Sequence, residues 1–305
     1  MTLTDDPLVS VIIATYNSAR YVSDTLNSIK VQTWRNIELI ITDDGSTDNT
    51  VPVCAYWLAE NKDRFPSTKL ITVAQNTGIP SNCNRGLRVA NGEWIKIIAG
   101  DDILLENAVR DNVTFAGQFP DASFIISDVQ EIDENNRLIR DKVINEALIF
   151  FSGLSTAKKQ LKDYSRWPAF LNSPTFFYRR GVLEKINYLD EEFRIYEDSP
   201  LLISVLENNV KLHYMNTPTV AYRIHANGIS RDPLMDESRK KEGVQVFRKY
   251  RKRHLSPFNP IDLSIHYDSW LRFKYKGVHG RMGVTLLKKF SLFYWYLRAN
   301  GIKTY

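Results

Sequence analysis

Four short apolar runs in the first third of the chain constrain the fold most. They span residues 8–14, 37–42, 69–74 and 92–99, and a segment with the apolar spacing of a helix follows each one. Apolar runs without polar alternation are typical of strands buried on both faces. Because strands that alternate with helices favour right-handed crossovers, we predict an α/β fold with a mostly parallel central sheet.

Polar and acidic side chains stand where three of these predicted strands end. Tyr16 follows the first, Asp43 and Asp44 the second, and Asp101 and Asp102 the fourth. Open α/β sheets bind ligands at the carboxyl ends of their strands, so these residues predict a ligand site. An aromatic ring and a carboxylate suit a nucleobase, while the second acid pair suits Mg²⁺ or Mn²⁺ carrying a phosphate. The alternative for that pair is a turn with a helix cap.

In the first half of the chain, Asn17 or Ser18 is predicted to cap the first helix.

The second half of the chain gives a more mixed pattern of predicted helices and strands. Further on, we predict a helix near residues 105–119 and another that opens at Glu197 and Asp198. Strands are predicted at 123–127, 173–178, 211–215 and 220–224, with a turn at 135–136 and a short helix at 179–186.

Absent motifs exclude several classes of protein. No Gly-x-Gly-x-x-Gly follows the first strand and no Gly-x-x-x-x-Gly-Lys-Ser/Thr occurs, which argues against a dinucleotide dehydrogenase and a P-loop NTPase. No run of 18 apolar residues and no signal-peptide pattern is present. The two cysteines, Cys54 and Cys83, form neither a disulfide framework nor a zinc spacing. We therefore expect a cytoplasmic protein, either free or peripheral at the inner face of the membrane.

Seven short motifs together resemble a known family. They occur in the order Val9–Asn17, Asp43–Asp48, Asn76–Gly78, Asn84–Gly86, Gly92–Ile95, Gly100–Asp102 and Glu197–Asp198. Each is weak alone, but the ordered set resembles the family 2 glycosyltransferases of GT-A fold, the inverting nucleotide-sugar enzymes of bacterial polysaccharide assembly. The resemblance implies a GT-A domain over residues 1–230 and leaves residues 231–305 as a basic, aromatic-rich helical extension.

The resemblance implies where the nucleotide binds. Tyr16 and Asp44 are expected to contact the base, usually uracil. Their neighbours Thr15, Asn17 and Asp43 are expected to complete this part of the nucleotide-sugar site.

The resemblance also assigns the chemistry. Asp101 and Asp102 are expected to hold a divalent metal and the diphosphate, Asp198 to act as the catalytic base, and Glu197 to orient it or the acceptor. Inverting transfer needs one carboxylate to take the acceptor proton and a cation to stabilise the departing nucleoside diphosphate. A helix N-terminus favours the ionised form of Asp198. The alternative for this acid pair is ordinary charge at a helix start.

Two positions depart from the family pattern. Ala99 stands where many relatives carry an acid, and Cys83 where many carry an arginine. Arg85 is expected to replace the lost cation at the nucleotide sugar, with a surface salt bridge as its alternative. Asp101 and Asp102 are expected to be sufficient as protein ligands of the metal without an acid at Ala99, because Mg²⁺ takes few protein ligands in such sites. Cys83 itself is interpreted as a small buried residue rather than a nucleophile.

A Tyr-Arg-x-His segment, Tyr222–His225, resembles one found near the end of many such domains. It places His225 as a metal ligand or diphosphate contact and Arg223 as a cation that neutralises the diphosphate. The alternative for His225 is a structural role.

Charge is distributed unevenly along the chain. Residues 231–305 hold 17 Lys and Arg against 6 Asp and Glu, a net charge of +11, while the remainder holds 23 against 29, a net charge of −6. Cations and aromatic rings interleave at 248–254, 270–276 and 286–297. This composition favours contact with an anionic membrane surface, and the alternative is a helical cap on the domain or on another subunit of a homo-oligomer. The acidic body and the absence of a recognised motif argue against nucleic acid.

These observations predict a metal-dependent, inverting glycosyltransferase that moves one sugar from a UDP-sugar to a lipid-linked oligosaccharide in O-antigen, capsule or similar synthesis. The Gln-x-x-Arg-Trp motif of processive synthases is incomplete, since no Gln precedes Arg166-Trp167 in register. A non-catalytic sugar-nucleotide-binding or scaffold protein of the same fold is the main alternative. A nucleotidyltransferase is disfavoured, because no Gly-rich basic phosphate loop is present.

Overall fold

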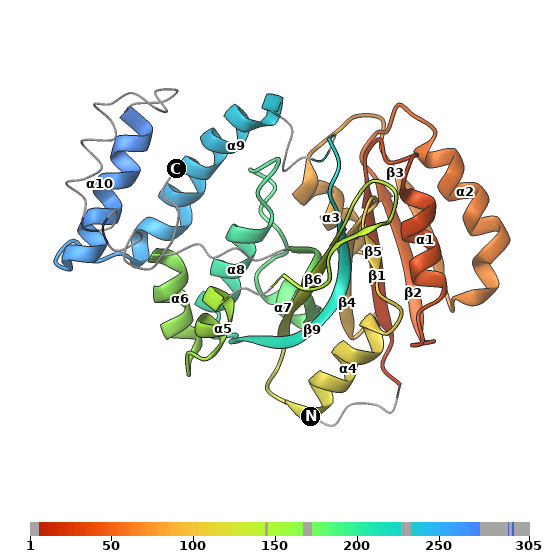
Figure 1. Ribbon diagram of the computed structural model, residues 1–305, viewed down its shortest axis with the longest axis horizontal. Helices are drawn as coiled ribbons and strands as arrows, with labels where there is room; N and C mark the ends of the chain where they lie inside the picture. The colour runs from red at the N-terminus through yellow and green to blue at the C-terminus, as the bar shows by residue number, and fades with distance from the viewer. Residues whose placement is uncertain are drawn as a thin grey trace.

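One mixed sheet forms the centre of the molecule (Figure 1). The computed structural model describes residues 6–143, 146–166, 173–226, 228, 233–274, 292 and 295. Within them, nine strands follow the order β3-β2-β1-β4-β8-β6-β9-β5, with β7 paired to β6. The strands are β1 Val9–Thr15, β2 Ile37–Asp43, β3 Thr68–Thr72, β4 Trp94–Ala99, β5 Ile103–Leu104, β6 Phe124–Ile132, β7 Leu138–Arg140, β8 Phe177–Arg179 and β9 Leu212–Arg223.

The predicted parallel half is confirmed. β1 pairs in parallel with β2 and with β4, and β2 pairs in parallel with β3. β8 is antiparallel to both β4 and β6, so the sheet becomes mixed beyond β4. The apolar runs of β1 and β2 are buried along their length, as expected for strands covered on both faces.

Helices cover both faces of the sheet. One face packs against α1 Val22–Lys30, α2 Thr50–Asn61 and α4 Ala108–Gln118. The other face packs against α3 Ile79–Leu87, α5 Glu146–Ser152, α6 Ala157–Arg166, α7 Arg180–Lys185 and α8 Asp198–Glu207. This arrangement leaves the strand ends, rather than the faces, free to carry a site.

Two longer helices complete the described chain. α9 Pro233–Val246 continues through a π-helical turn, η3 Phe247–Arg251, and a 3₁₀ turn, η4 Lys252–His254, and α10 Pro260–Lys274 follows. Within the described ranges, no helix combines the length and apolarity needed to cross a bilayer. The predicted boundary at residue 230 and most of the aromatic stretches at 270–276 and 286–297 lie outside the described residues.

Four sequence-based details were wrong. α1 begins at Val22 with Tyr21 at its cap, so neither Asn17 nor Ser18 caps it. Asn17 instead takes a positive φ of 49°, its N–H donates to Ser46 Oγ at 2.8 Å, and its side chain accepts from the Thr47 N–H. The helix predicted near residue 105 begins at Ala108, after the short strand β5. The strand predicted at 173–178 begins at Phe177, after the 3₁₀ turn η2 Ser173–Thr175, and the two strands predicted at 211–224 are the single strand β9.

A buried carboxylate joins β1, β2 and the turn before β4. Glu38, in β2, is 1% exposed and accepts hydrogen bonds from the Ser10 hydroxyl, the Asn91 N–H and the Gly92 N–H, the last at 2.9 Å. Burial raises the pKa of Glu38, but these hydrogen bonds outweigh it and hold the pKa below its ordinary value. Gly92 is required there, because a Cβ would lie 2.5 Å from the Ser10 nitrogen.

Replacing Glu38 with Ala should lower the free energy of unfolding by about 3 kcal/mol, because it leaves buried donors without an acceptor. Since its pKa is lowered on folding, its contribution should be complete above the unfolded value near 4.5 and be lost as the pH falls. Urea unfolding at pH 7 and at pH 4 measures both effects. Glu60→Ala, an exposed change on α2, is the control, and equal losses in the two variants would contradict the assignment.

Candidate active site

The ends of β2, β1 and β4 lie side by side, as predicted. In the parallel register Thr15 pairs with Asp43, and Ala14 pairs with Ala99. The residues that follow these strands therefore share one edge. Tyr16, directly after β1, is 47% exposed there.

Thr15 and Asp43 lie below this edge rather than on it. Both are about 1% exposed, and the Thr15 hydroxyl donates to Asp43 Oδ2 at 2.9 Å. Asp43 Oδ1 also accepts the Ser46 N–H at 2.9 Å. Because Ser46 in turn accepts from the Asn17 N–H, this set fixes the loops after β1 and β2 against each other.

Asp44 organises the loop that leads into α3. It is 2% exposed and accepts from the Thr77 N–H at 3.0 Å and the Gly78 N–H at 2.8 Å. The Arg85 guanidinium, 17% exposed, pairs with Asp44 at 2.6 Å, so the salt bridge considered for Arg85 forms inside this site. Burial raises the pKa of Asp44, but bonds from Thr77 and Arg85 hold it below its ordinary value.

Asp101 and His225 meet at the end of β4. His225 Nε2 lies 3.0 Å from Asp101 Oδ2, with side-chain exposures of 7% and 30%. The imidazole also packs against the Tyr21 ring, with centroids 4.8 Å apart. β9, which ends at Arg223, therefore brings the predicted Tyr-Arg-x-His segment to the acid pair.

Asp102 points inward, unlike its neighbour Asp101. It is 1% exposed; Oδ1 accepts the Arg223 N–H at 2.9 Å, and Oδ2 has no hydrogen-bond partner among the described residues. Burial, followed by the charge of Asp101, raises the pKa of Asp102 well above its ordinary value. Arg223 is fully enclosed: its Nε donates to the Asp101 carbonyl at 2.7 Å and its Nη2 to Asp24 at 3.2 Å.

Lys96 is a residue that the sequence reasoning passed over. It stands in the middle of β4, is 1% exposed, and donates to the Pro174 carbonyl. Burial lowers the pKa of Lys96 to about 7, although the nearby Asp102 opposes this. The sequence feature that could have identified Lys96 is a single lysine in an otherwise apolar strand.

Asp101 and His225 fit part of a divalent-metal site. One carboxylate and one imidazole within 3.0 Å of each other match the donors that Mn²⁺ accepts. In the part of the chain that is described, no three His, Cys, Asp or Glu side chains are grouped to hold a metal. Mg²⁺ and Mn²⁺ bound to a substrate diphosphate need only one or two protein ligands, so a pair is sufficient.

Glu197 and Asp198 stand at the start of α8, as predicted. Both are half-buried; Glu197 accepts from the Ser173 hydroxyl at 2.7 Å, and Asp198 accepts the Ser199 N–H at 2.6 Å. Burial, then the neighbouring Asp198, raises the pKa of Glu197 to about 7. Burial also raises the pKa of Asp198, opposite to the effect of the helix terminus, and its ionisation at neutral pH stays a prediction.

Cys83 is close to both groups of acids, since Asp44 and Glu197 both act on its thiol. It is 2% exposed, which confirms its interpretation as a small buried residue. Burial raises the pKa of its thiol, Glu197 and Asp44 raise it further, and Arg85 opposes them. These groups therefore lie close to one another around α3.

The segment before Glu197 is a second feature that sequence reasoning missed. The Arg194 carbonyl accepts the Ile79 N–H at 2.8 Å, and the Arg194 guanidinium donates to the Asn76 side chain at 2.8 Å. Gly78, with φ of 102°, admits this approach because a Cβ would lie 2.9 Å from Arg194 Cα. The loop held by Asp44 is thus joined directly to the segment that carries Glu197.

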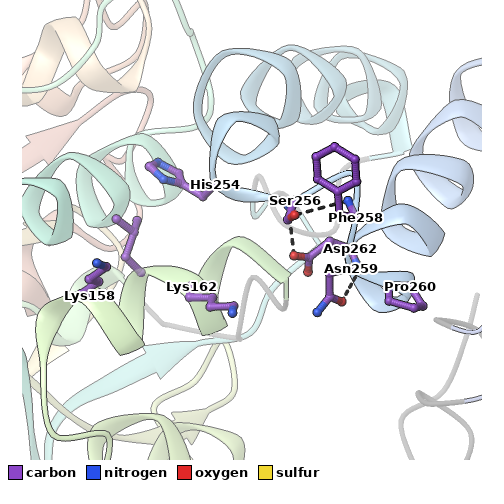
Figure 2. A pocket seen from close by; sticks show the side chains of 9 residues that line it. Lys158, Lys162, His254, Ser256, Phe258, Asn259, Pro260 and Asp262 are labelled. Atoms are coloured by element: carbon purple, nitrogen blue, oxygen red, sulfur yellow. Dashed lines mark hydrogen bonds between the residues drawn. The ribbon is translucent and has the colours of Figure 1, made fainter.

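A cavity of about 490 Å³ lies apart from these residues (Figure 2). Its walls come from α6 and from residues 254–262, and none of the sequence-predicted site residues lines it. The strand edge, where the titratable groups gather, is therefore the better candidate for the chemistry.

Comparisons with known proteins agree with this geometry. Residues 10–186 match the family model described as "Glycosyl transferase family 2". Over 229 residues the chain is 28% identical to the UDP-Glc:alpha-D-GlcNAc-diphosphoundecaprenol beta-1,3-glucosyltransferase WfaP of Escherichia coli, covering 73% of this chain and 80% of WfaP.

Two solved structures share the fold. TarS 1–349 of S. aureus, in complex with UDP-GlcNAc, has a TM-score of 0.63 at 17% identity, over 93% of this chain and 79% of that one. The mannosyltransferase PcManGT of Pyrobaculum calidifontis, in complex with GDP-Man and Mn²⁺, has a TM-score of 0.60 at 17% identity, over 98% and 87%. The predicted GT-A fold is confirmed.

Glu197→Gln should alter how stability depends on pH. A carboxyl whose pKa rises from 4.5 to about 7 on folding destabilises the protein as the pH rises through that window. The variant should therefore gain about 2 kcal/mol relative to wild type between pH 4.5 and pH 8, somewhat less than the full linkage value because solvent reaches the group. Urea unfolding at both pH values measures the gain. Glu60→Gln, exposed on α2, should show none, and a flat difference for Glu197→Gln would contradict the raised pKa.

Proposed function

This chain belongs to glycosyl transferase family 2, and from that premise we propose that it moves one sugar, with inversion, from a UDP-sugar to a lipid-linked oligosaccharide in polysaccharide synthesis. The chain is a glycosyltransferase, so a nucleotidyltransferase and a non-catalytic scaffold are both disfavoured. The observation that carries the proposal is the shared edge, where Tyr16, Asp44 and Asp101 follow three adjacent strands and His225 pairs with Asp101.

The base of the nucleotide stacks on Tyr16, in this proposal. That ring is 47% exposed at the end of β1, which suits stacking. The oxygens of Asp44 are largely taken by Thr77, Gly78 and Arg85, so Asp44 acts on the base by holding the loop beside it. Of the other predicted nucleotide residues, Thr15 and Asp43 support the site from below, and the exposed Asn17 lies beside Tyr16 in the loop that they fix.

Asp101 and His225 would hold the divalent metal. A bound Mg²⁺ or Mn²⁺ supplies positive charge that stabilises the departing diphosphate. Because the side chains of Asp102 and Arg223 are enclosed, we assign them positioning roles: Arg223 fixes the Asp101 carbonyl, and Asp102 fixes the Arg223 N–H. Arg85, paired with Asp44, is the proposed cation at the nucleotide sugar.

Asp198 is the proposed base. Its raised pKa makes the ionised carboxylate a stronger proton acceptor than a free aspartate, which suits removal of the acceptor hydroxyl proton. Glu197, held by the Ser173 hydroxyl, orients the acceptor beside it. Asp198 takes the proton of the acceptor hydroxyl. The hydroxyl oxygen bonds to the anomeric carbon of the sugar, and the bond between that carbon and the UDP oxygen breaks.

Titration of UDP by calorimetry, with and without Mn²⁺, tests the donor site. Binding should require Mn²⁺ and weaken at least tenfold in Asp101→Asn, because one of two protein ligands is weakened. Asp198→Asn should bind UDP normally but lose about 100-fold or more in turnover of the UDP-sugar that the wild type uses. The exposed change Asp63→Asn is the control for both measurements.

Two results would count against the proposal. If the wild type bound UDP equally with and without Mn²⁺, the metal assignment would fail. If it bound no UDP at all while another nucleoside diphosphate bound, the donor class would be wrong although the fold assignment stands.

Membrane contact by the C-terminal region, proposed as residues 231–305, would bring the enzyme to a lipid-linked acceptor at the cytoplasmic face. WfaP is named for an acceptor on diphosphoundecaprenol, which supports this choice. Phe258 is 94% exposed in the loop before α10, and Lys158 and Lys162 on α6 line the same cavity (Figure 2). An exposed aromatic ring beside cations suits a membrane interface with anionic lipid.

Phe258→Asp should weaken binding to vesicles of phosphatidylglycerol and phosphatidylcholine by about tenfold, because it removes the apolar anchor and adds a negative charge. Sedimentation with vesicles at low and physiological salt measures it. Tyr56→Asp makes the same kind of change at another exposed aromatic ring, 72% exposed on α2, and serves as the control. Equal losses in both variants would argue against this surface.

A further inference from the structure

Glu242 in α9 binds three consecutive backbone N–H groups. Its Oε1 accepts from Arg194 at 3.1 Å, and its Oε2 accepts from Ile195 at 3.0 Å and Tyr196 at 3.2 Å. Hydrogen bonds to an ionised acceptor are the strong class, and successive N–H groups form a natural anion site. A side chain from α9 thus fixes the backbone directly before Glu197 and Asp198.

The opposite side of this segment is fixed as well. The Arg194 carbonyl accepts the Ile79 N–H, and the Arg194 guanidinium donates to the Asn76 side chain. Residues 194–196 therefore lie between α9 and the loop that Asp44 organises. They have little freedom as long as both sets of bonds persist.

A second set of contacts holds the beginning of the same loop. Lys249 pairs with Asp190 at 2.6 Å and Glu192 at 2.7 Å, and the Tyr250 hydroxyl donates to Asp190 at 2.6 Å. Burial lowers the pKa of Lys249, but these acids outweigh it and raise the pKa above its ordinary value. The end of α9 and η3 thus hold residues 190–196 at both ends, with α9 beside the segment that leads into α8 (Figure 1).

We propose that Glu242 is a positioning residue that sets the geometry of the Glu197–Asp198 pair through the backbone of residues 194–196. The role of that acid pair rests on the function proposed above. Glu242 lies beyond residues 10–186, which match the family model, so the positioning is supplied by the C-terminal region of this chain. The α9 helix acts on catalysis without touching substrate.

The experiment compares Glu242→Gln and Glu242→Asp with Glu237→Gln, an exposed change on the same helix. Amide hydrogen exchange of the peptide covering residues 190–200 needs no substrate. It should accelerate about tenfold in Glu242→Gln, because the amide offers one uncharged acceptor in place of a carboxylate. Peptides covering β1 and β4 should not change, and Glu237→Gln should match wild type.

Kinetics with the UDP-sugar that the wild type turns over best provide the second reading. Glu242→Gln should lower kcat about tenfold while the donor KM stays within twofold, since the donor binds at the strand edge. Glu242→Asp, which keeps the charge on a shorter stem, should recover part of kcat. If Glu242 had only a structural role, its replacement would lower the amount of folded protein but would not lower kcat while leaving KM unchanged.

Each result decides one part of the proposal. Unchanged exchange in Glu242→Gln would overturn the clamp itself, and faster exchange with an unchanged kcat would overturn its catalytic role. Wild-type protein that turned over no nucleotide sugar would overturn the proposed function and the catalytic role together. The exchange result would still show whether Glu242 holds the segment, so the two failures are distinguishable.

Discussion

The parallel pairing of β1 with β2 and β4 is the constraint on which the site depends. It fixes three strand ends in one register, so residues separated by up to 85 positions in sequence come to one edge. The pairing is between backbones, and it persists because the side chains of all three strands are buried on both faces. The loops beyond the strands are then free to carry polar groups at little cost to the core.

Buried ionisable side chains beneath the edge orient these polar groups. Lys96, Asp102 and Arg223 are each 2% exposed or less, and a buried polar group of this kind is costly unless it has hydrogen-bond partners. Arg223 meets this requirement by binding the Asp101 carbonyl and Asp24, which leaves the Asp101 carboxylate turned toward His225. The enclosed groups thus stabilise an arrangement that the exposed acid alone would not keep.

The local sequence pattern was sufficient to predict the helices, the strands and the shared strand edge, but not the contacts between these elements. The apolar runs and Gly-Asp-Asp motif place Tyr16 and Asp101 correctly, because strand period and strand-end chemistry are local properties. The clamp by Glu242 and the enclosure of Arg223 join positions 48 and 122 residues apart. Such contacts depend on tertiary packing, which no window of sequence records. The false cap at Asn17 has the same origin, since the side-chain oxygen of Asn17 accepts from the Thr47 N–H instead of a helix N–H.

The acid pair at the start of α8 shows which of two opposing electrostatic effects is larger. A helix terminus stabilises a carboxylate by about 0.3–1 kcal/mol, equal to less than one pKa unit. Burial and the second acid raise the pKa of Glu197 from 4.5 to about 7, which corresponds to about 3 kcal/mol in the opposite direction. Desolvation and like-charge repulsion therefore decide the outcome. Because burial makes a negative charge costly at this position, the ionised form of an acid placed there accepts a proton more readily, and the surrounding backbone must hold it in place.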